Sequence, residues 1–207
     1  MDVNQLKQLP LMGIVRGIEL DVVEPLVETV ISSGLKTIEV TMNTPKASEL
    51  IQRMLKVAQG RLIIGAGTVL TADDLQSALD SGATFIVLPT LVRDVVERCV
   101  KNNIPVFPGA LTPQEIHDAW RAGATMVKVF PAKFFGPSYF KEIKAPFQKI
   151  ELLACGGVTP GNIQSFFSCG ASAVAFGASV FKKEWLAAKD FLRIRQSIKE
   201  LIAAIGQ

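Results

Sequence analysis

Short apolar runs alternate with longer amphipathic stretches along all 207 residues, and this alternation limits the fold more than any other feature. Eight of the runs have the length and composition of buried strands. They occupy residues 13–15, 37–40, 62–64, 85–88, 105–107, 126–129, 152–154 and 173–176. Helical patterns lie between them at 22–33, 45–58, 72–81, 92–102, 113–122 and 161–168. Continuous β/α alternation predicts a parallel sheet covered by helices.

Small residues mark the expected ends of these helices. Glycine accepts the left-handed conformation that closes a helix. It follows the last turn of many of the predicted helices, at Gly34, Gly60, Gly82, Gly123 and Gly170. Threonine–proline pairs at 44–45, 112–113 and 159–160 are typical of helix starts.

About eight β/α units fit the length of the chain, at the small end of the range for a barrel. No linker or low-complexity segment divides the sequence. We therefore predict an α/β fold with a single (β/α)8 TIM-barrel domain over residues 1–207. A doubly wound open sheet is the alternative, but Gly13 and Gly17 flank the first strand without the G-x-G-x-x-G pattern of dinucleotide-binding sheets.

Composition argues against several classes of function. The chain is 49% hydrophobic and 20% charged, with a formal net charge of +3 and no basic block with interleaved aromatic residues, so nucleic-acid binding is not expected. It shows no leader pattern and no long apolar segment, which predicts a cytoplasmic protein away from membranes. Cys99, Cys155 and Cys169 form no CxxC pair, so reduced thiols are expected. With a single histidine, His117, the chain has too few ligands for a zinc site, and we predict no metal or other cofactor.

Lys128 is the residue with the clearest chemical implication. It stands in the apolar run 126–130 (Met-Val-Lys-Val-Phe), which Pro131 closes. An amine in apolar surroundings loses hydration, so more of it is in the uncharged form that attacks ketones to give a Schiff base. The alternative is a lysine that reaches solvent from the strand end or pairs with a carboxylate for structural reasons.

A second ionisable residue, Glu39, is expected to share a cavity with Lys128. Side chains alternate across a strand, so if Ile38 and Val40 face the helices, Glu39 faces the barrel interior. The same argument places Lys128 inside, near the end of the strand where barrels carry their active sites. A carboxylate beside an amine is either a structural ion pair or a proton shuttle next to a nucleophile, and the position favours the second.

Glycine-rich turns follow three of the predicted strands. Gly156 and Gly157 come after the seventh strand, and Gly177 and Ser179 come after the eighth. At these two places barrels often bind phosphate through backbone amides. The 65–68 turn, Gly-Ala-Gly-Thr, follows the third strand and would suit a carboxylate. The alternative is that the small residues only permit tight turns.

These segments resemble a known family, the 2-keto-3-deoxy-6-phosphogluconate aldolases and their 6-phosphogalactonate relatives. The resemblance covers nearly the whole chain. It is carried by 14–17 (IVRG), 38–41 (IEVT), 64–69 (IGAGTV), 108–109 (PG), 127–132 (VKVFPA), 156–160 (GGVTP) and 177–179 (GAS). The Gly-Ala-Gly-Thr-Val and Lys-Val-Phe-Pro-Ala segments, in the same order and spacing, are the most specific.

The resemblance implies a (β/α)8 barrel that cleaves a 2-keto-3-deoxy-6-phospho sugar acid to pyruvate and glyceraldehyde 3-phosphate as a class I aldolase. It implies Lys128 as the Schiff-base lysine and Glu39 as the general acid/base. At the two ends of the substrate it implies carboxylate binding by Arg16 and Thr68, and phosphate binding by Gly156, Gly157, Gly177 and Ser179. It also implies a cytoplasmic homotrimer that needs no metal.

Two positions depart from the gluconate branch of that family. Met42-Asn43 stands where arginine is common, and Cys155 stands where threonine often precedes the glycine pair. Asn43-Thr44-Pro45 and the setting of Arg16 are closer to the galactonate branch, so the configuration at C4 of the substrate stays open. Asn43 and Cys155 are predicted to line the substrate site, Cys155 as a small pocket residue and not as a nucleophile. A phosphosugar isomerase or epimerase, or a non-catalytic barrel that binds a phosphorylated ligand, are the alternative functions.

Overall fold

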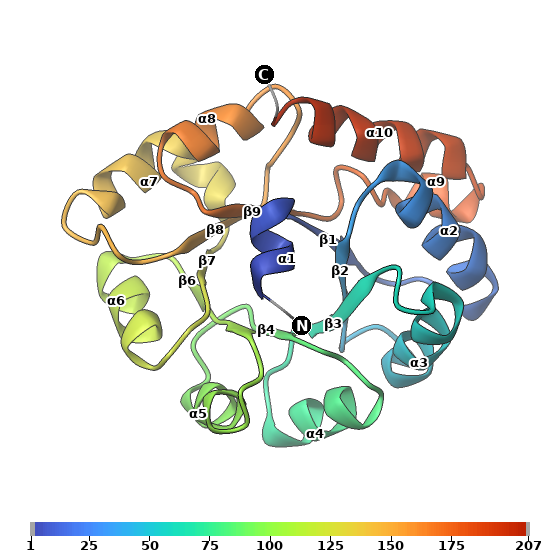
Figure 1. Ribbon diagram of the computed structural model, residues 1–207, viewed down its shortest axis with the longest axis horizontal. Helices are drawn as coiled ribbons and strands as arrows, with labels where there is room; N and C mark the ends of the chain where they lie inside the picture. The colour runs from blue at the N-terminus through green and yellow to red at the C-terminus, as the bar shows by residue number, and fades with distance from the viewer. Residues whose placement is uncertain (1–2, 206–207) are drawn as a thin grey trace.

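The computed structural model describes residues 3–205, in which nine parallel strands form a nearly closed barrel inside a ring of helices (Figure 1). The strands are β1 (Leu11–Val15), β2 (Thr37–Thr41), β3 (Ile63–Gly67), β4 (Ile86–Val87), β5 (Val106–Phe107), β6 (Gly109–Ala110), β7 (Val127–Val129), β8 (Leu152–Cys155) and β9 (Ala173–Phe176). Their order in the sheet is β5-β4-β3-β2-β1-β9-β8-β7-β6. The predicted barrel is confirmed and the open doubly wound sheet is wrong, because the first strand pairs with the last.

The prediction of eight strands is one too few because the fifth strand is broken at Pro108. β5 pairs with β4, and β6 pairs with β7. Proline has no N–H to donate, but the Pro108 carbonyl accepts a hydrogen bond from the Lys128 N–H at 2.9 Å. The Val106 carbonyl accepts another from the Thr125 N–H at 2.8 Å. Hydrogen bonds therefore join both pieces of the fifth strand to β7 or to the residues just before it, and the barrel closes at this point.

Strand alternation separates an outer core from an inner one. The outer core lies between strands and helices and includes Ile38, Val40, Val127 and Val129. The inner core fills the barrel with Leu6, Met12, Phe85, Val87, Phe107, Met126, Leu153, Cys155, Ala173 and Ala175. Because Glu39 and Lys128 each lie between two outer-core residues, both side chains point inward. The predicted facing of these two strands is confirmed.

The helices are α1 (Val3–Gln8), α2 (Val23–Ser33), α3 (Ala47–Ala58), α4 (Ala72–Asp80), α5 (Arg93–Lys101), α6 (Pro113–Arg121), α7 (Gly136–Lys144), α8 (Ile163–Ser168), α9 (Lys183–Ala187) and α10 (Phe191–Ala203), with short 3-10 turns at Leu20–Val22 and Ala132–Phe134. Each of the six predicted helical stretches contains a helix. The sequence patterns did not indicate α1, α7, α9 or α10.

The predicted helix ends are partly confirmed. All five glycines have a positive φ, between 79° and 100°, and Thr112 caps α6 by accepting a hydrogen bond from the Glu115 N–H at 3.3 Å. The other two Thr-Pro pairs do not start helices, because α3 begins at Ala47 and α8 at Ile163. After β8 the Asn162 side chain accepts a hydrogen bond from the Thr159 N–H at 2.8 Å, which keeps these residues in a loop.

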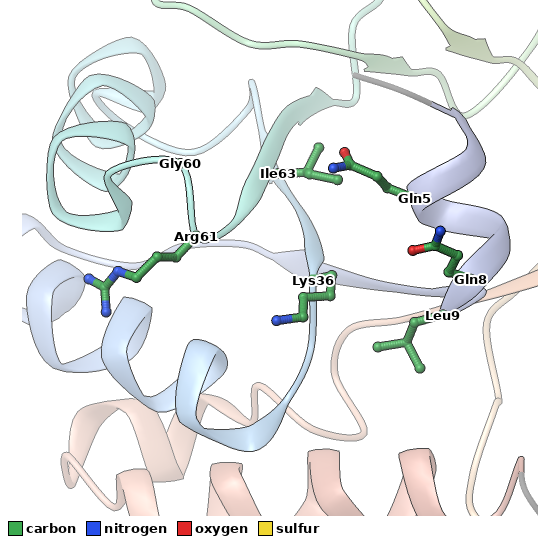
Figure 2. A pocket seen from close by; sticks show the side chains of 7 residues that line it. All are labelled: Gln5, Gln8, Leu9, Lys36, Gly60, Arg61 and Ile63. Carbon is green, nitrogen blue, oxygen red and sulfur yellow. The ribbon is translucent and has the colours of Figure 1, made fainter.

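α1 closes the end of the barrel at which the strands begin. Figure 1 shows it across the middle of the ring of strands, and its Leu6 is fully buried in the inner core. A pocket of about 480 Å³ lies beside it (Figure 2). Its lining consists of Gln5, Gln8, Leu9, Lys36, Gly60, Arg61 and Ile63. Since Lys36 precedes β2 and Arg61 precedes β3, this pocket lies at the opposite end from the C-terminal ends of the strands.

Leu6→Ala should lower the free energy of unfolding by about 2–5 kcal/mol, because it leaves a cavity where a buried side chain stood. Gln5→Ala is the matched control: its side chain is exposed on the same helix, and the change should stay within about 0.5 kcal/mol. Denaturant unfolding followed by circular dichroism measures both. Equal effects of the two variants would show that α1 does not seal the barrel.

Candidate functional site

Glu39 is an isolated acid inside the barrel. It lies at the centre of β2, is 1% exposed, and its Oε2 atom has no hydrogen-bond partner among the described residues. It is also the only acid among the buried residues of 5–205. Burial raises the pKa of this carboxyl, and the positive charges of Lys128 and Arg16 only partly oppose that rise. A carboxylate in this setting accepts a proton more readily than one in water.

Lys128 faces Glu39 from the other side of the barrel. It sits in β7, next to Gly109 of β6 and Leu153 of β8 in register, and only 6% of it is exposed. Its Nζ lies 5.2 Å from the centre of the Phe130 ring. No N···O contact within 4.0 Å joins it to Glu39, whose Oε2 is unpaired. The geometry therefore argues against a structural ion pair between the two groups.

Cys155 is the third buried group of the site. It ends β8 and is 3% exposed. Burial raises the pKa of its thiol to about 11, while the charges of Lys128 and Arg16 lower it and that of Glu39 raises it. A thiol with this pKa stays protonated near neutral pH, and the thiolate is the reactive form. This argues against a nucleophilic role, and the charges of Lys128, Arg16 and Glu39 all act on the thiol.

Gly67 determines where the Glu39 carboxyl can lie, a role that the sequence pattern did not reveal. A β carbon at position 67 would stand 2.5 Å from Oε1 of Glu39. In the β2–β3 register Gly67 pairs with Thr41, the next inward residue of β2. A larger residue at this position would therefore displace the Glu39 carboxyl from its present place. The available signal was a glycine inside a strand, which often marks a close approach.

Arg16 and Thr68 meet at the mouth of the barrel, where Nη2 of Arg16 donates a hydrogen bond to Oγ1 of Thr68 at 3.4 Å. Thr68 has a φ of 56°, which is uncommon for a β-branched residue and marks local strain. Thr44 holds the neighbouring loop: its hydroxyl accepts from the Gly17 N–H at 3.0 Å and lies 3.0 Å from the Thr41 hydroxyl. The sequence reasoning missed this role because it assigned Thr44 to a helix start.

The two glycine turns follow neighbouring strands. β8 and β9 pair in register with Cys155 opposite Ala175, so both turns leave the sheet at the same end of the barrel. Gly156 and Gly157 both have a positive φ, 95° and 80°. A β carbon at Gly177 would lie 3.2 Å from Ile14 of β1, so this turn is also tight. Ser179 is exposed in the same loop.

Asn43 is exposed in the turn after β2, and its side chain makes no hydrogen bond with the described part of the chain.

Within residues 3–205 no helix is long and apolar enough to cross a membrane. Over the same residues no three His, Cys, Asp or Glu side chains come together in a way that would hold a metal ion.

Comparisons with known proteins agree with this geometry. A family model for KDPG and KHG aldolase matches residues 3–197. The 2-dehydro-3-deoxy-6-phosphogalactonate aldolase of Escherichia coli (strain K12) is 34% identical over 84% of this chain and 86% of its own length. The solved structure of native KDPGal has a TM-score of 0.88 at 32% identity, covering 95% of this chain and 94% of that one.

A second solved structure, the 2-keto-3-deoxy-6-phosphogluconate aldolase of Zymomonas mobilis ZM4 with 3-phosphoglycerate, has a TM-score of 0.85 at 26% identity. That match covers 98% of this chain and 95% of the other. The similarity thus extends over the barrel and over every strand that carries the site. The chain belongs to the KDPG and KHG aldolase family and is an aldolase, a lyase of carbohydrate metabolism.

Proposed function

We propose that this aldolase cleaves a 2-keto-3-deoxy-6-phospho sugar acid through a Schiff base on Lys128. One observation carries the proposal: a buried amine and a buried, unpaired carboxyl face the same barrel interior without bonding to each other. Both groups are therefore available to a substrate that lies between them. An amine beside a positioned acid/base group is what imine chemistry requires.

In the proposed reaction the Lys128 ammonium releases one proton and its amine attacks the C2 ketone. A proton then returns as the C2 oxygen leaves as water, which gives a protonated imine. Glu39 removes the proton of the C4 hydroxyl while the C3–C4 bond breaks, and the bonding electrons pass to the imine nitrogen as an enamine. Glyceraldehyde 3-phosphate departs. Protonation of the enamine carbon and attack of water on the imine then release pyruvate and restore the amine. General acid–base help of this kind contributes roughly 10²–10⁴-fold in rate.

The ends of the substrate are assigned to the two halves of the site. Arg16 and Thr68 bind the carboxylate, which their contact at the mouth of the barrel supports. The amides of Gly156, Gly157 and Gly177 with the Ser179 hydroxyl bind the phosphate. Two observations support this: these loops adjoin, and the Zymomonas mobilis relative is described with 3-phosphoglycerate, a phosphorylated acid. Asn43 and Cys155 line the part of the site between the carboxylate end and the phosphate end of the substrate.

The alternative functions have less support. A phosphosugar isomerase that exchanges protons between two carboxylates would need a second buried acid, and Glu39 is alone in that respect among residues 5–205. A barrel that only binds a phosphorylated ligand has no use for a buried amine facing an unpaired carboxyl.

Purified protein should release pyruvate from 2-keto-3-deoxy-6-phosphogluconate or its galactonate epimer, measured by coupling to lactate dehydrogenase. The ratio of kcat/KM for the two epimers, with 4-hydroxy-2-oxoglutarate as a third substrate, identifies the preferred one. Borohydride with pyruvate should attach a three-carbon adduct to Lys128, detected by peptide mass spectrometry.

Lys128→Met is the control for both assays, because it removes the amine and keeps an apolar chain of similar length. It should fold, show no adduct and lose most activity. Folded wild-type protein that shows neither pyruvate release nor an adduct would overturn the proposed function, and an active Lys128→Met would overturn the role of this residue.

The rate should depend on pH through Glu39. A carboxyl must be ionised to accept the C4 hydroxyl proton, and burial raises its pKa above the usual 4.5. Activity is therefore present above the raised pKa and should fall as the pH drops through it, at a higher pH than an exposed glutamate would give. In Glu39→Gln the activity should fall about 10²–10⁴-fold, and the loss of activity at low pH should disappear from the pH–rate profile. An unchanged loss of activity at low pH in Glu39→Gln would assign the titration to another group.

We further propose that residues 1–207 form one domain, and that the chain assembles as a homotrimer and works in the cytoplasm. The family resemblance supports the trimer, and three free cysteines suit a reducing compartment. Light scattering of the purified protein should give three times the mass of the chain. A mass equal to that of one chain, at the concentration of the activity assay, would contradict the assembly.

A further inference from the structure

Lys133 lies directly against the glycine turn that follows β8. A β carbon at Gly157 would stand 2.5 Å from the β carbon of Lys133 and 3.2 Å from its α carbon. A β carbon at Gly156 would lie 3.7 Å from Pro131, just upstream in the same segment. The residues after β7 therefore cover the turn after β8, and Lys133 is the cation that they bring to it.

The ammonium of Lys133 forms no ion pair with a carboxylate of the described residues. The residue is exposed, and no ion pair links it to a carboxylate in the part of the chain whose side chains are described. Its Nζ lies 5.1 Å from the centre of the Phe134 ring, which is itself 69% exposed. A flexible four-carbon stem joins this amine to a β carbon that already touches the turn. The amine can therefore reach an anion bound there.

We propose that Lys133 is a specificity-determining residue whose ammonium binds the phosphate of the substrate on the Gly156–Gly157 turn. This inference rests on the proposed function, which places the phosphate there. Backbone amides supply partial charges only, whereas a phosphate ester is a dianion at neutral pH. A mobile ammonium at the open side of the turn supplies a full charge without narrowing the site, and charge-assisted bonds to phosphate are stronger than neutral ones.

The inference predicts a selective effect on phosphorylated ligands. Lys133→Gln should weaken binding of glycerol 3-phosphate about tenfold, the size expected for one lost bond to a charged group. Lys133→Arg keeps the charge and should stay within about threefold of the wild type. Isothermal titration calorimetry on the full chain measures both. Under turnover, Lys133→Gln should raise KM for the phosphorylated substrate about tenfold and leave kcat within about twofold.

Lys141→Gln is the matched control, because this lysine is exposed on α7 and its loss changes the net charge equally. It should bind glycerol 3-phosphate like the wild type. Equal weakening in Lys133→Gln and Lys141→Gln would show that the lost affinity comes from the lower net charge of the protein and not from the position of Lys133. That result would overturn the inference. Wild-type affinity in Lys133→Gln, or no binding of glycerol 3-phosphate by the wild type, would overturn it as well.

Trapping pyruvate with borohydride separates this inference from the function on which it rests. Pyruvate has no phosphate, so Lys133→Gln should form the Lys128 adduct as the wild type does. An adduct in both proteins, together with unchanged glycerol 3-phosphate affinity, would overturn the role of Lys133 alone. Absence of the adduct in both would overturn the Schiff-base mechanism, and the calorimetry would still decide whether Lys133 binds phosphate.

Discussion

The burial of one unpaired carboxyl is the constraint on which the rest of the site depends. Glu39 lies inside the barrel next to a largely apolar inner core, and an isolated charge there is costly unless other groups offset it. The offset comes from the positive charges of Lys128 and Arg16, which act on the carboxyl without bonding to it. A direct ion pair would stabilise the fold more but would leave neither group free. The structure therefore retains an unfavourable burial that keeps an acid and an amine open to a ligand.

Sheet topology decides which residues can share this site. The order β3-β2-β1-β9-β8-β7 is a run of six adjacent strands, and every candidate site residue lies on them or in the loops that follow them. Thr68 follows β3 and Arg16 follows β1, whereas the glycine turns follow β8 and β9. The pairing of β1 with β9 joins these two groups. The site thus has separate ends for two anionic groups, with the amine and the acid between them.

Much of this arrangement could be predicted from the sequence. Strand alternation correctly placed Glu39 and Lys128 inside the barrel, because period-two apolar patterning directly reflects burial on the outer face. Helix ends at Gly34 and Gly82 could also be predicted, since a left-handed residue is a local requirement. Thr44 could not, because a Thr-Pro pair fits both a helix start and a loop hydrogen bond. Only the position of Gly17 decides between them. The second piece of the fifth strand, Gly109–Ala110, was likewise hidden, because two residues after a proline are too short to show a pattern.

The sequence by itself determined the β/α repeat, the parallel sheet, and the inward direction of the amine and the acid. These follow from local periodicity, which each short segment carries independently of its neighbours. Only the tertiary structure decided that Gly67 leaves space for the Glu39 carboxyl, that α1 covers the end of the barrel where the strands begin, and that Lys133 lies on the Gly157 turn. Each of these is a contact between segments far apart in the chain. Its existence depends on strand register and barrel closure, which no single segment encodes.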